Sequence, residues 1–180
     1  MLKRLLFITF TLLLIIACSG GATETNKSPK VHLLTAVANA DDDMIKQHIT
    51  FGTDINELFV ETEDWKGAGA LHIASISPTN TESIMKYKTV VELLLSGGAN
   101  IDIKARNQDA ATPLAWAVYF GKAEMVEFLL ARSANVNAAD KNGYTPLDGA
   151  LASPFMGSEL NRSAIVSFLR NKGAKTRSDD

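Results

Sequence analysis

The chain has 180 residues, of which 46% are hydrophobic and 21% are charged, and its formal net charge is −2. This balance is that of a globular protein with a core and excludes an intrinsically disordered chain. The lysines and arginines are scattered, so the sequence lacks the basic field that gathers phosphates, and we expect no nucleic-acid partner.

Residues 1–17 have the three parts of a secretory signal peptide. Lys3 and Arg4 give a positive start, Leu5 to Ala17 form an apolar run, and small residues follow. The run is too short to cross a bilayer, which needs about 20 apolar residues. The alternative is a buried N-terminal helix, but uninterrupted apolarity would leave that helix no polar face. We therefore expect an exported protein.

The only cysteine of the chain, Cys18, follows this segment. The residues Ile15-Ile16-Ala17-Cys18 resemble the lipobox of bacterial lipoproteins, in which the cysteine is acylated and becomes the mature N-terminus. The resemblance implies a membrane anchor through acyl chains. Ser19 stands where an aspartate usually signals retention, which implies the outer membrane of a Gram-negative bacterium, facing the periplasm. Residues 18–30 are mostly small and polar, and we expect them to form a flexible tether.

A pattern of 33 residues then repeats. Thr112-Pro113-Leu114 and Thr145-Pro146-Leu147 are 33 residues apart, "VVELLLSGGANID" matches "MVEFLLARSANVN", and "HLLTAVANADDDMIKQHITFGTDIN" is a more divergent copy. This pattern resembles the ankyrin repeat, in about four copies at residues 31–60, 61–103, 104–139 and 140–175, followed by a polar tail at 176–180. The resemblance implies an all-α repeat solenoid in which each repeat is a helix-loop-helix unit with a β-turn or hairpin.

The residues of the pattern suit this unit. A threonine before proline caps a helix, because its hydroxyl accepts an orphan N–H and proline fits the first helical position. Gly52, Gly98 and Gly173 are expected to end second helices, where a left-handed backbone is needed, and Ser133 takes that place in copy three. Arg170 stands where the earlier copies have apolar residues, so we expect copy four to be a solvent-facing cap.

Copies two and four carry insertions between their two helices. Gly69 to Thr112 spans 43 residues rather than 33, and copy four has a similar excess around "SPFMGSELN". Insertions in repeat proteins map to one face, so the two loops are expected to protrude from the same edge. Loop growth without function is the alternative, because surface loops lengthen at little entropic cost. We expect "TESIMKYKTVVELLL" to extend the second helix of copy two.

The sequence contains no evident catalytic or metal-binding constellation, so we expect no enzyme activity, no cofactor and no metal. His32, His48 and His72 are far apart. His72 occupies the histidine position of the ankyrin "TPLH" motif, which implies a structural hydrogen bond. The three aspartates at 41–43 precede a helix, where carboxylates favour the positive helix end, and they offer too few oxygens for calcium.

The family resemblance also implies a protein-binding surface, because ankyrin proteins generally bind other proteins through the turn tips and the concave face of the first helices. Carried over position by position, the proposed surface residues are Trp65, Lys66, Ile76, Gln108, Asp109, Tyr119, Phe120, Lys141, Asn142 and Tyr144. Large apolar side chains exposed there would mark an interface, unless the lengthened loops fold over them. Trp116, four residues after Thr112, is expected to pack in the core.

Together these patterns predict a lipid-anchored, non-enzymatic protein of the cell envelope that mediates protein–protein interaction as an adaptor or scaffold. We expect a monomer. The alternative is an inhibitor or immunity protein that binds and blocks a secreted toxin or an envelope enzyme. Binding of a small ligand would need a deep polar pocket, which a shallow concave stack seldom provides.

Overall fold

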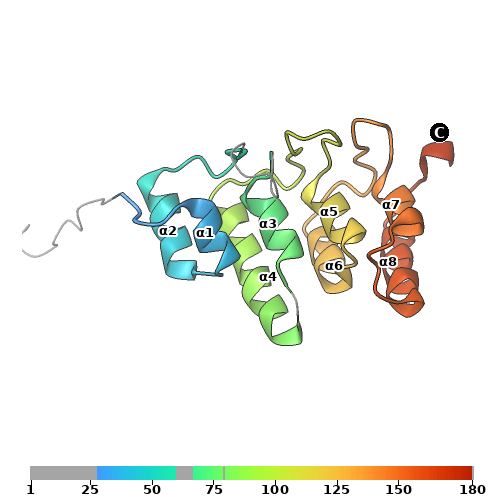
Figure 1. The fold of residues 1–180 in the computed structure, drawn as a ribbon, viewed down its shortest axis with the longest axis horizontal. Coiled ribbons are helices and arrows are strands. Elements are labelled where there is room, and N and C mark those ends of the chain that lie inside the picture. Colours follow the sequence, from blue (N-terminus) through green and yellow to red (C-terminus); the bar gives the residue numbers. More distant parts are fainter. Residues whose placement is uncertain (1–27, 60–66, 79, 180) are drawn as a thin grey trace, which may run out of the picture.

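Eight α-helices stacked in pairs make up the described part of the chain (Figure 1). The computed structural model describes residues 28–59, 67–78 and 80–179. Its helices are α1 (Leu33–Ala38), α2 (Asp42–Phe51), α3 (Ala70–Ile76), α4 (Thr81–Ser96), α5 (Pro113–Tyr119), α6 (Ala123–Ala131), α7 (Pro146–Ala152) and α8 (Glu159–Asn171). Within these ranges the only β-structure is an isolated bridge between Phe59 and Ala68. The expected all-α repeat solenoid is confirmed.

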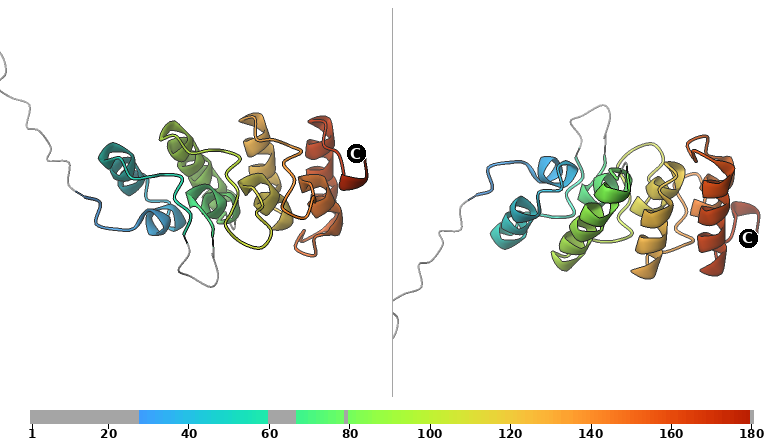
Figure 2. Two further views of the ribbon diagram at one scale, coloured as in Figure 1. Left: turned by 90° about the horizontal axis from the view of Figure 1, so that it is seen from above. Right: turned by 90° about the horizontal axis from the view of Figure 1, so that it is seen from below.

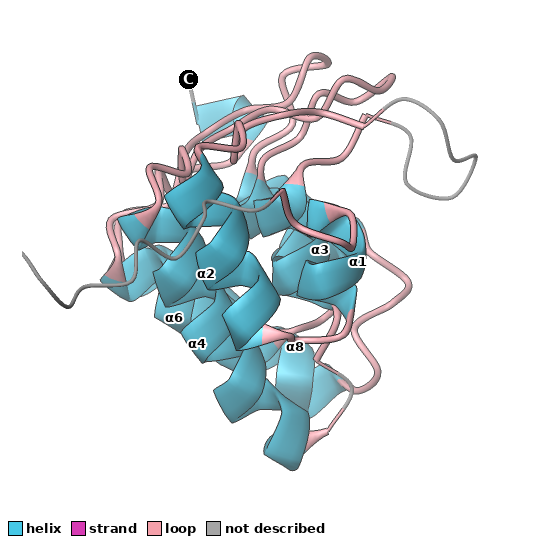
Figure 3. Cartoon of the chain, turned by 90° about the vertical axis from the view of Figure 1, so that its left-hand side faces the viewer, coloured by secondary structure: helices cyan, strands magenta, loops and turns pink. Residues whose placement is uncertain are grey.

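The helices form two rows, seen from above and below in Figure 2 and from one end in Figure 3. The first helices α1, α3, α5 and α7 pack in order, and so do the second helices α2, α4, α6 and α8. Turns between consecutive pairs gather at one edge, the tip edge (residues 52–59 with 67–69, 97–112 and 132–145). The loops that join the two helices of each pair lie at the opposite edge, the interhelix edge (residues 39–41, 77–78 with 80, 120–122 and 153–158).

Threonine and proline start the first helices of copies three and four, as expected. The hydroxyls of Thr112 and Thr145 each accept the backbone N–H three residues later, at 3.3 Å. In copy two Gly69 stands at this position and offers no hydroxyl. There the N–H of Gly69 donates to Nδ1 of His72 at 3.1 Å. In all three copies a side-chain hydrogen bond therefore closes the first turn of the helix.

The second helices end at a left-handed residue. Gly52, Gly98 and Gly173 have φ angles of 84°, 91° and 80°, and Ser133 has 66°. Glycine adopts this backbone without steric cost, whereas a side chain crowds it. The expected positions are confirmed, and copy three carries a small local strain at Ser133.

The insertions lengthen the second helices of copies two and four. Helix α4 has 16 residues and α8 has 13, against 10 in α2 and 9 in α6. The expected extension of α4 is confirmed, and its added turns are anchored. Ile84 and Tyr87 are buried, and the Tyr87 hydroxyl donates to the carbonyl of Ala38 at the end of α1.

The core lies between the two rows. Its fully buried leucines recur at matching positions, Leu71, Leu114 and Leu147 in the first helices and Leu94, Leu129 and Leu169 in the second, each at most 2% exposed. Burying one such side chain contributes about 2 kcal/mol. Leu130 of copy three is also buried, whereas Arg170 at the corresponding position of copy four is exposed, so α8 turns a polar side to solvent.

One side chain per repeat reaches the next repeat along the tip edge. The side-chain amide of Asn56 donates to the carbonyl of Gly98 in copy two at 3.0 Å. Its oxygen accepts the backbone N–H of Asn100, also in copy two, at 2.7 Å. Asn137 makes the same two bonds to copy four, at 3.2 and 2.8 Å. Asp102 holds the matching position between them, but its carboxylate only accepts, from the N–H of Asn135 at 2.9 Å.

The polar tail folds back onto the last pair of helices. Residues Arg177–Asp179 form a short 3-10 helix. The N–H of Arg177 donates to Oδ2 of Asp148 at 2.9 Å, and the Thr145 hydroxyl donates to the carbonyl of Lys175 at 2.7 Å. The segment after α8 thus completes the tip edge of copy four.

None of the helices in the described ranges is long and apolar enough to cross a membrane. The expected signal peptide, Cys18 and the tether up to residue 27 lie outside the described residues. The expectations for them rest on the sequence.

Replacing Asp102 with asparagine is expected to stabilise the protein by about 1 kcal/mol. The new side-chain amide would donate to the carbonyl of Ser133, as Asn56 and Asn137 donate to Gly98 and Gly173. Urea unfolding of Asp102→Asn measures the change in the free energy of unfolding. The reverse change Asn137→Asp is the matched control and should destabilise by a similar amount. Equal or lower stability of Asp102→Asn would contradict the role given to this position.

Candidate protein-binding surface

The predicted surface residues fall into three groups. Seven are exposed: Gln108, Asp109, Lys141, Asn142 and Tyr144 at the tip edge, and Tyr119 and Phe120 where α5 ends. Trp65 and Lys66 lie outside the described residues. Ile76 is buried. The structure therefore separates the predicted surface into a tip-edge part and an interhelix-edge part.

The prediction that Ile76 faces solvent is wrong, since its side chain is only 8% exposed. All seven residues of α3 are buried, because this helix packs against α1, α4 and α5. Pro78, in the loop that follows, is buried as well. The helices around α3 thus account for the burial of Ile76.

The insertion of copy four adds an aromatic ring to the surface. Phe155 joins Tyr119 and Phe120 in an aromatic cluster (Tyr119, Phe120 and Phe155) with ring centroids 5.3 to 5.9 Å apart. Tyr119 is 43% exposed, Phe120 39% and Phe155 54%. The rings are tilted or edge-to-face, the arrangement that aromatic pairs favour.

Sequence reasoning missed Phe155. Its loop is an insertion, which has no counterpart in the repeat pattern from which a surface position can be carried over. The available signal was composition, since "PFM" is unusually apolar for a surface loop. Met156 accounts for part of that apolarity because it is buried, whereas its neighbour Phe155 is exposed.

Hydrogen bonds fix the loop that carries Phe155. The Ser153 hydroxyl donates to the carbonyl of Tyr119 at 2.5 Å and accepts the N–H of Phe155 at 3.1 Å. The Asn161 amide donates to the carbonyls of Gly121 and Met156, at 2.8 and 2.7 Å. These bonds tie the loop both to α5 and to the start of α8, so the third ring is held against the other two.

Arg162 adds to this frame from α8. Its guanidinium donates to the carbonyl of Ala150 at 2.5 Å and to that of Ser153 at 2.9 Å. It also lies 3.4 Å from Oε2 of Glu159. The arginine therefore satisfies carbonyls at the end of α7 that no helical N–H reaches.

Gly121 permits the close approach of the loop. Its φ is 63°, and a β-carbon there would lie 2.8 Å from the carbonyl oxygen of Phe155. Any side chain at this position would displace the loop. The glycine between α5 and α6 thus also contacts the loop of the neighbouring repeat at Phe155.

The insertion of copy two is tied to the same turn. Nζ of Lys122 donates to the carbonyl of Pro78 at 2.7 Å. Burial lowers the pKa of the Lys122 amine. Both lengthened loops therefore contact the α5–α6 turn, at Lys122 on one side and at Gly121 on the other.

The helix and the loop that carry the aromatic cluster, α5 and residues 153–158, contain no charged residue, and the first charged residues that follow them are Lys122 and Glu159. Burying a charged partner group against such a surface would lose its hydration without compensation. An apolar or neutral partner group fits it best.

Trp116 is half-buried and packs against the core, at the expected inward position. Its ring meets that of His72 edge-on, with centroids 4.9 Å apart. His72 is fully buried, and its Nε2–H donates to the carbonyl of Ala111 at 3.1 Å. Desolvation by burial lowers the pKa of His72 to about 4, against an opposing effect of this hydrogen bond. The imidazole is therefore neutral and links copy two to copy three.

The other two histidines also have structural partners. His32 accepts the N–H of Leu34 at the start of α1, and His48 lies within hydrogen-bond distance of Thr53 and of the carbonyl of Val31. Asp41 caps α2 by accepting the N–H of Met44 at 3.0 Å. In the described part of the chain, no group of three or more histidine, cysteine, aspartate or glutamate side chains could hold a metal ion.

Comparison with known proteins agrees with this architecture. The family model for ankyrin repeats matches residues 83–180 in three copies. The notch homolog protein 1 of Xenopus tropicalis is 29% identical over 168 residues, covering 79% of this chain and 6% of the notch protein.

Two other relatives match about half of the chain. A probable palmitoyltransferase of Saccharomyces uvarum is 35% identical over 88 residues, or 49% of this chain and 12% of the relative. The ARF GTPase-activating protein Git of Drosophila melanogaster is 38% identical over 80 residues, or 44% of this chain and 10% of the relative. The chain thus spans only a small fraction of these proteins' own lengths.

Acid is expected to weaken the fold through His72. Its folded pKa of about 4 lies below the ordinary histidine value of 6.5, so the unfolded chain binds a proton first as the pH falls. The stability that depends on neutral His72 is fully present above pH 6.5. As the pH falls from 6.5 to about 4, the free energy of unfolding decreases by roughly 3 kcal/mol in total. The measurement is the free energy of unfolding from urea titrations between pH 4 and 7. In His72→Gln this part of the pH dependence should be missing, and a constant difference from the wild type would contradict the assignment.

Proposed function

Because this chain belongs to the ankyrin-repeat family, we propose that it acts as a protein-binding module of the cell envelope, held at a membrane by acyl chains on Cys18. Ankyrin repeats form protein–protein interaction modules. We propose the more specific role of an adaptor or scaffold for this chain. The lipid anchor is supported by the sequence "LLLIIACSG" and the basic start before it.

The aromatic cluster is the observation on which the binding role depends. Three contacting rings, each more than a third exposed, present apolar surface on a frame fixed by hydrogen bonds. Exposed aromatic side chains are typical anchors of protein interfaces. A partner that presents apolar side chains to the end of α5 would cover them.

An inhibitor or immunity role is the second candidate. It is favoured by Phe155, the most exposed of the three rings, which stands on a loop held on both sides by Ser153 and Asn161. A rigid projecting ring suits insertion into the cleft of a toxin or an envelope enzyme. The partner would then lose its activity on binding, whereas the partner of a scaffold would keep it.

We also propose that the chain has no enzymatic activity of its own. The palmitoyltransferase named above shares with this chain a segment that makes up 12% of its length, so its activity belongs to a much larger protein. The histidines of this chain serve helix capping and contacts between segments.

Replacing Phe155 with alanine is expected to weaken capture of the partner by at least about tenfold, as for a hot-spot aromatic residue. The free energy of unfolding should fall by no more than about 1.5 kcal/mol, since the ring is half exposed. Crosslinking pull-downs from envelope fractions, quantified for wild type and variant, give the binding; urea unfolding gives the stability.

Phe51→Ala is the matched control, because Phe51 on α2 is exposed to a similar degree but lies far along the stack from the cluster. Its capture should equal that of the wild type. Unchanged capture by Phe155→Ala would remove the cluster from the interface, and a loss of stability above about 3 kcal/mol would assign Phe155 to the core.

Cys18→Ala tests the anchor. The variant cannot be acylated at this position and should move from the membrane fraction to the soluble fraction, because the acyl chains supply the membrane affinity. Fractionation followed by immunoblotting measures the distribution, and metabolic labelling with a palmitate analogue measures acylation. Wild-type Cys18 without label, or a variant that stays in the membrane fraction, would contradict the lipoprotein assignment.

A further inference from the structure

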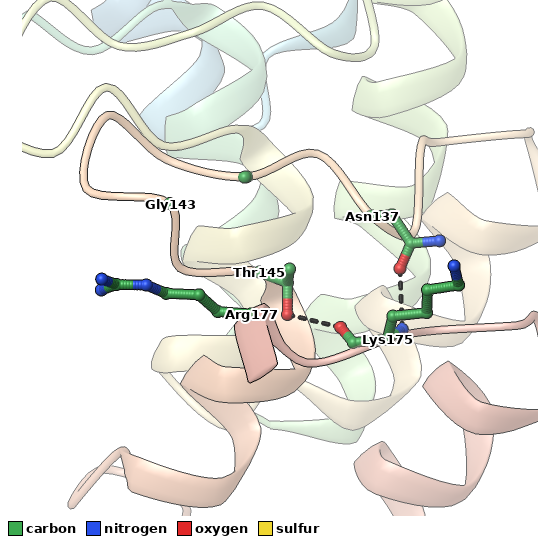
Figure 4. Close-up of a pocket in the computed structure, with 6 residues that line it drawn as sticks. Asn137, Gly143, Thr145, Lys175 and Arg177 are labelled. Carbon is green, nitrogen blue, oxygen red and sulfur yellow. Dashed lines mark hydrogen bonds between the residues drawn. The ribbon is translucent and has the colours of Figure 1, made fainter. Parts of the chain in front are cut away.

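A hollow of about 460 Å³ lies at the tip edge, between the turn of copy four and the segment that follows α8 (Figure 4). It is lined by Asn137, Ala139, Gly143, Thr145, Lys175 and Arg177. The hollow is at the opposite edge of the helix pairs from the loop that carries the aromatic cluster. It is therefore a separate feature of the last repeat.

The polar groups that shape the hollow are fixed. The side chain of Asn137 accepts the N–H of Lys175 at 2.8 Å and donates to the carbonyl of Gly173 at 3.2 Å. The Thr145 hydroxyl donates to the carbonyl of Lys175 at 2.7 Å. These bonds set the position of the segment after α8, so the walls of the hollow are in place without a ligand.

Two cations stand on its walls. Figure 4 shows the side chains of Lys175 and Arg177 leaving the same segment on opposite sides. The guanidinium carbon of Arg177 lies 5.2 Å from the ring centroid of Tyr144, which gives it a cation–π neighbour. Exposed Lys141, in the adjoining turn, adds a third positive charge to this part of the edge.

The nearby carboxylates are engaged by backbone N–H groups. Oδ1 of Asp140 accepts from Asn142 and Tyr144, at 2.7 and 2.9 Å. Oδ2 of Asp148 accepts the N–H of Arg177, and Oδ2 of Asp179 accepts that of Thr176. Within the described ranges, no carboxylate lies within 4 Å of the Arg177 guanidinium as an ion pair.

We propose that this hollow binds a carboxylate group of an acidic protein segment, with Arg177 as the main contact. A guanidinium matches a carboxylate with two parallel N–H donors. The backbone N–H groups of the turn are already taken by Asp140, so recognition falls to the side-chain cations.

Carboxylates lie between the cations of this edge, and they disfavour the binding of nucleic acids and anionic membranes. Asp109, Asp140 and Asp179 interrupt the positive charges along this edge, and the net charge of the chain is negative. A nucleic acid or an anionic bilayer presents continuous negative charge and would be repelled at those points. A peptide can place single carboxylates at the cations and neutral groups elsewhere.

The test uses the chain without residues 1–17 and a fluorescein-labelled peptide in which glutamates are separated by pairs of serines, with the same peptide carrying glutamine in place of glutamate as the uncharged control. Fluorescence anisotropy at low salt should show saturable binding of the glutamate peptide alone. Arg177→Gln should weaken it by about fivefold, the effect of losing one charge-assisted hydrogen bond, and Arg177→Lys by less. Lys86→Gln removes the same charge from an exposed site on α4 and should change the affinity by less than about twofold.

An NMR titration with the same peptide locates the binding site through changes in amide chemical shifts. Shifts centred on Gly143, Thr145, Lys175 and Arg177 support the proposal. The absence of saturable binding, an equal loss in Lys86→Gln, or shifts centred on other repeats would overturn it. Tighter binding of a single-stranded DNA oligonucleotide or of phosphatidylglycerol vesicles would overturn it in favour of a general polyanion site. None of these outcomes bears on the aromatic cluster.

Discussion

A single helix pair of this chain cannot bury its own apolar side chains, and the rest of the structure follows from that constraint. The leucines at 71, 114 and 147 are inaccessible to solvent because the first helices stack on one another as well as on their paired second helices. Stacking in turn requires a fixed register between repeats. Asn56 and Asn137 hold it at the tip edge, where each bonds to two backbone groups of the next copy. Stability is thus a sum over neighbouring pairs, with a polar face closing the series at Arg170.

The two edges of the stack differ in how much their loops vary in length. At the tip edge the turns are bonded to each other, backbone to backbone, as between Arg106 and Gly67 and between Lys141 and Asp109. At the interhelix edge the loops differ in length, and the insertions of copies two and four meet at the α5–α6 turn. Variation at this edge leaves the register untouched, because the register is set at the other one. The candidate binding surface formed by the aromatic cluster belongs to the variable edge.

The parts of the fold that depend on local chemistry could be predicted from the sequence. The caps at Thr112 and Thr145, the left-handed residue at Ser133 and the extension of α4 each follow from a rule about one residue or one short segment. Ile76 and Phe155 could not be predicted in this way. Whether Ile76 is covered depends on how α3 packs against α1, α4 and α5. The position of Phe155 depends on the path of an inserted loop, and that path is set by long-range bonds such as Asn161 to Gly121 that no periodicity encodes.

The loop of residues 153–158 is ordered before any partner arrives, because Ser153, Asn161 and Arg162 hold it to the two adjoining helices. The entropy of ordering this loop is therefore lost during folding and not during association. A partner that docks on the aromatic cluster meets a preformed surface, and its association rate is limited by orientation, in the range of about 10⁵ to 10⁷ M⁻¹ s⁻¹ for rigid docking. Differences in affinity between partners would then appear in how slowly they leave.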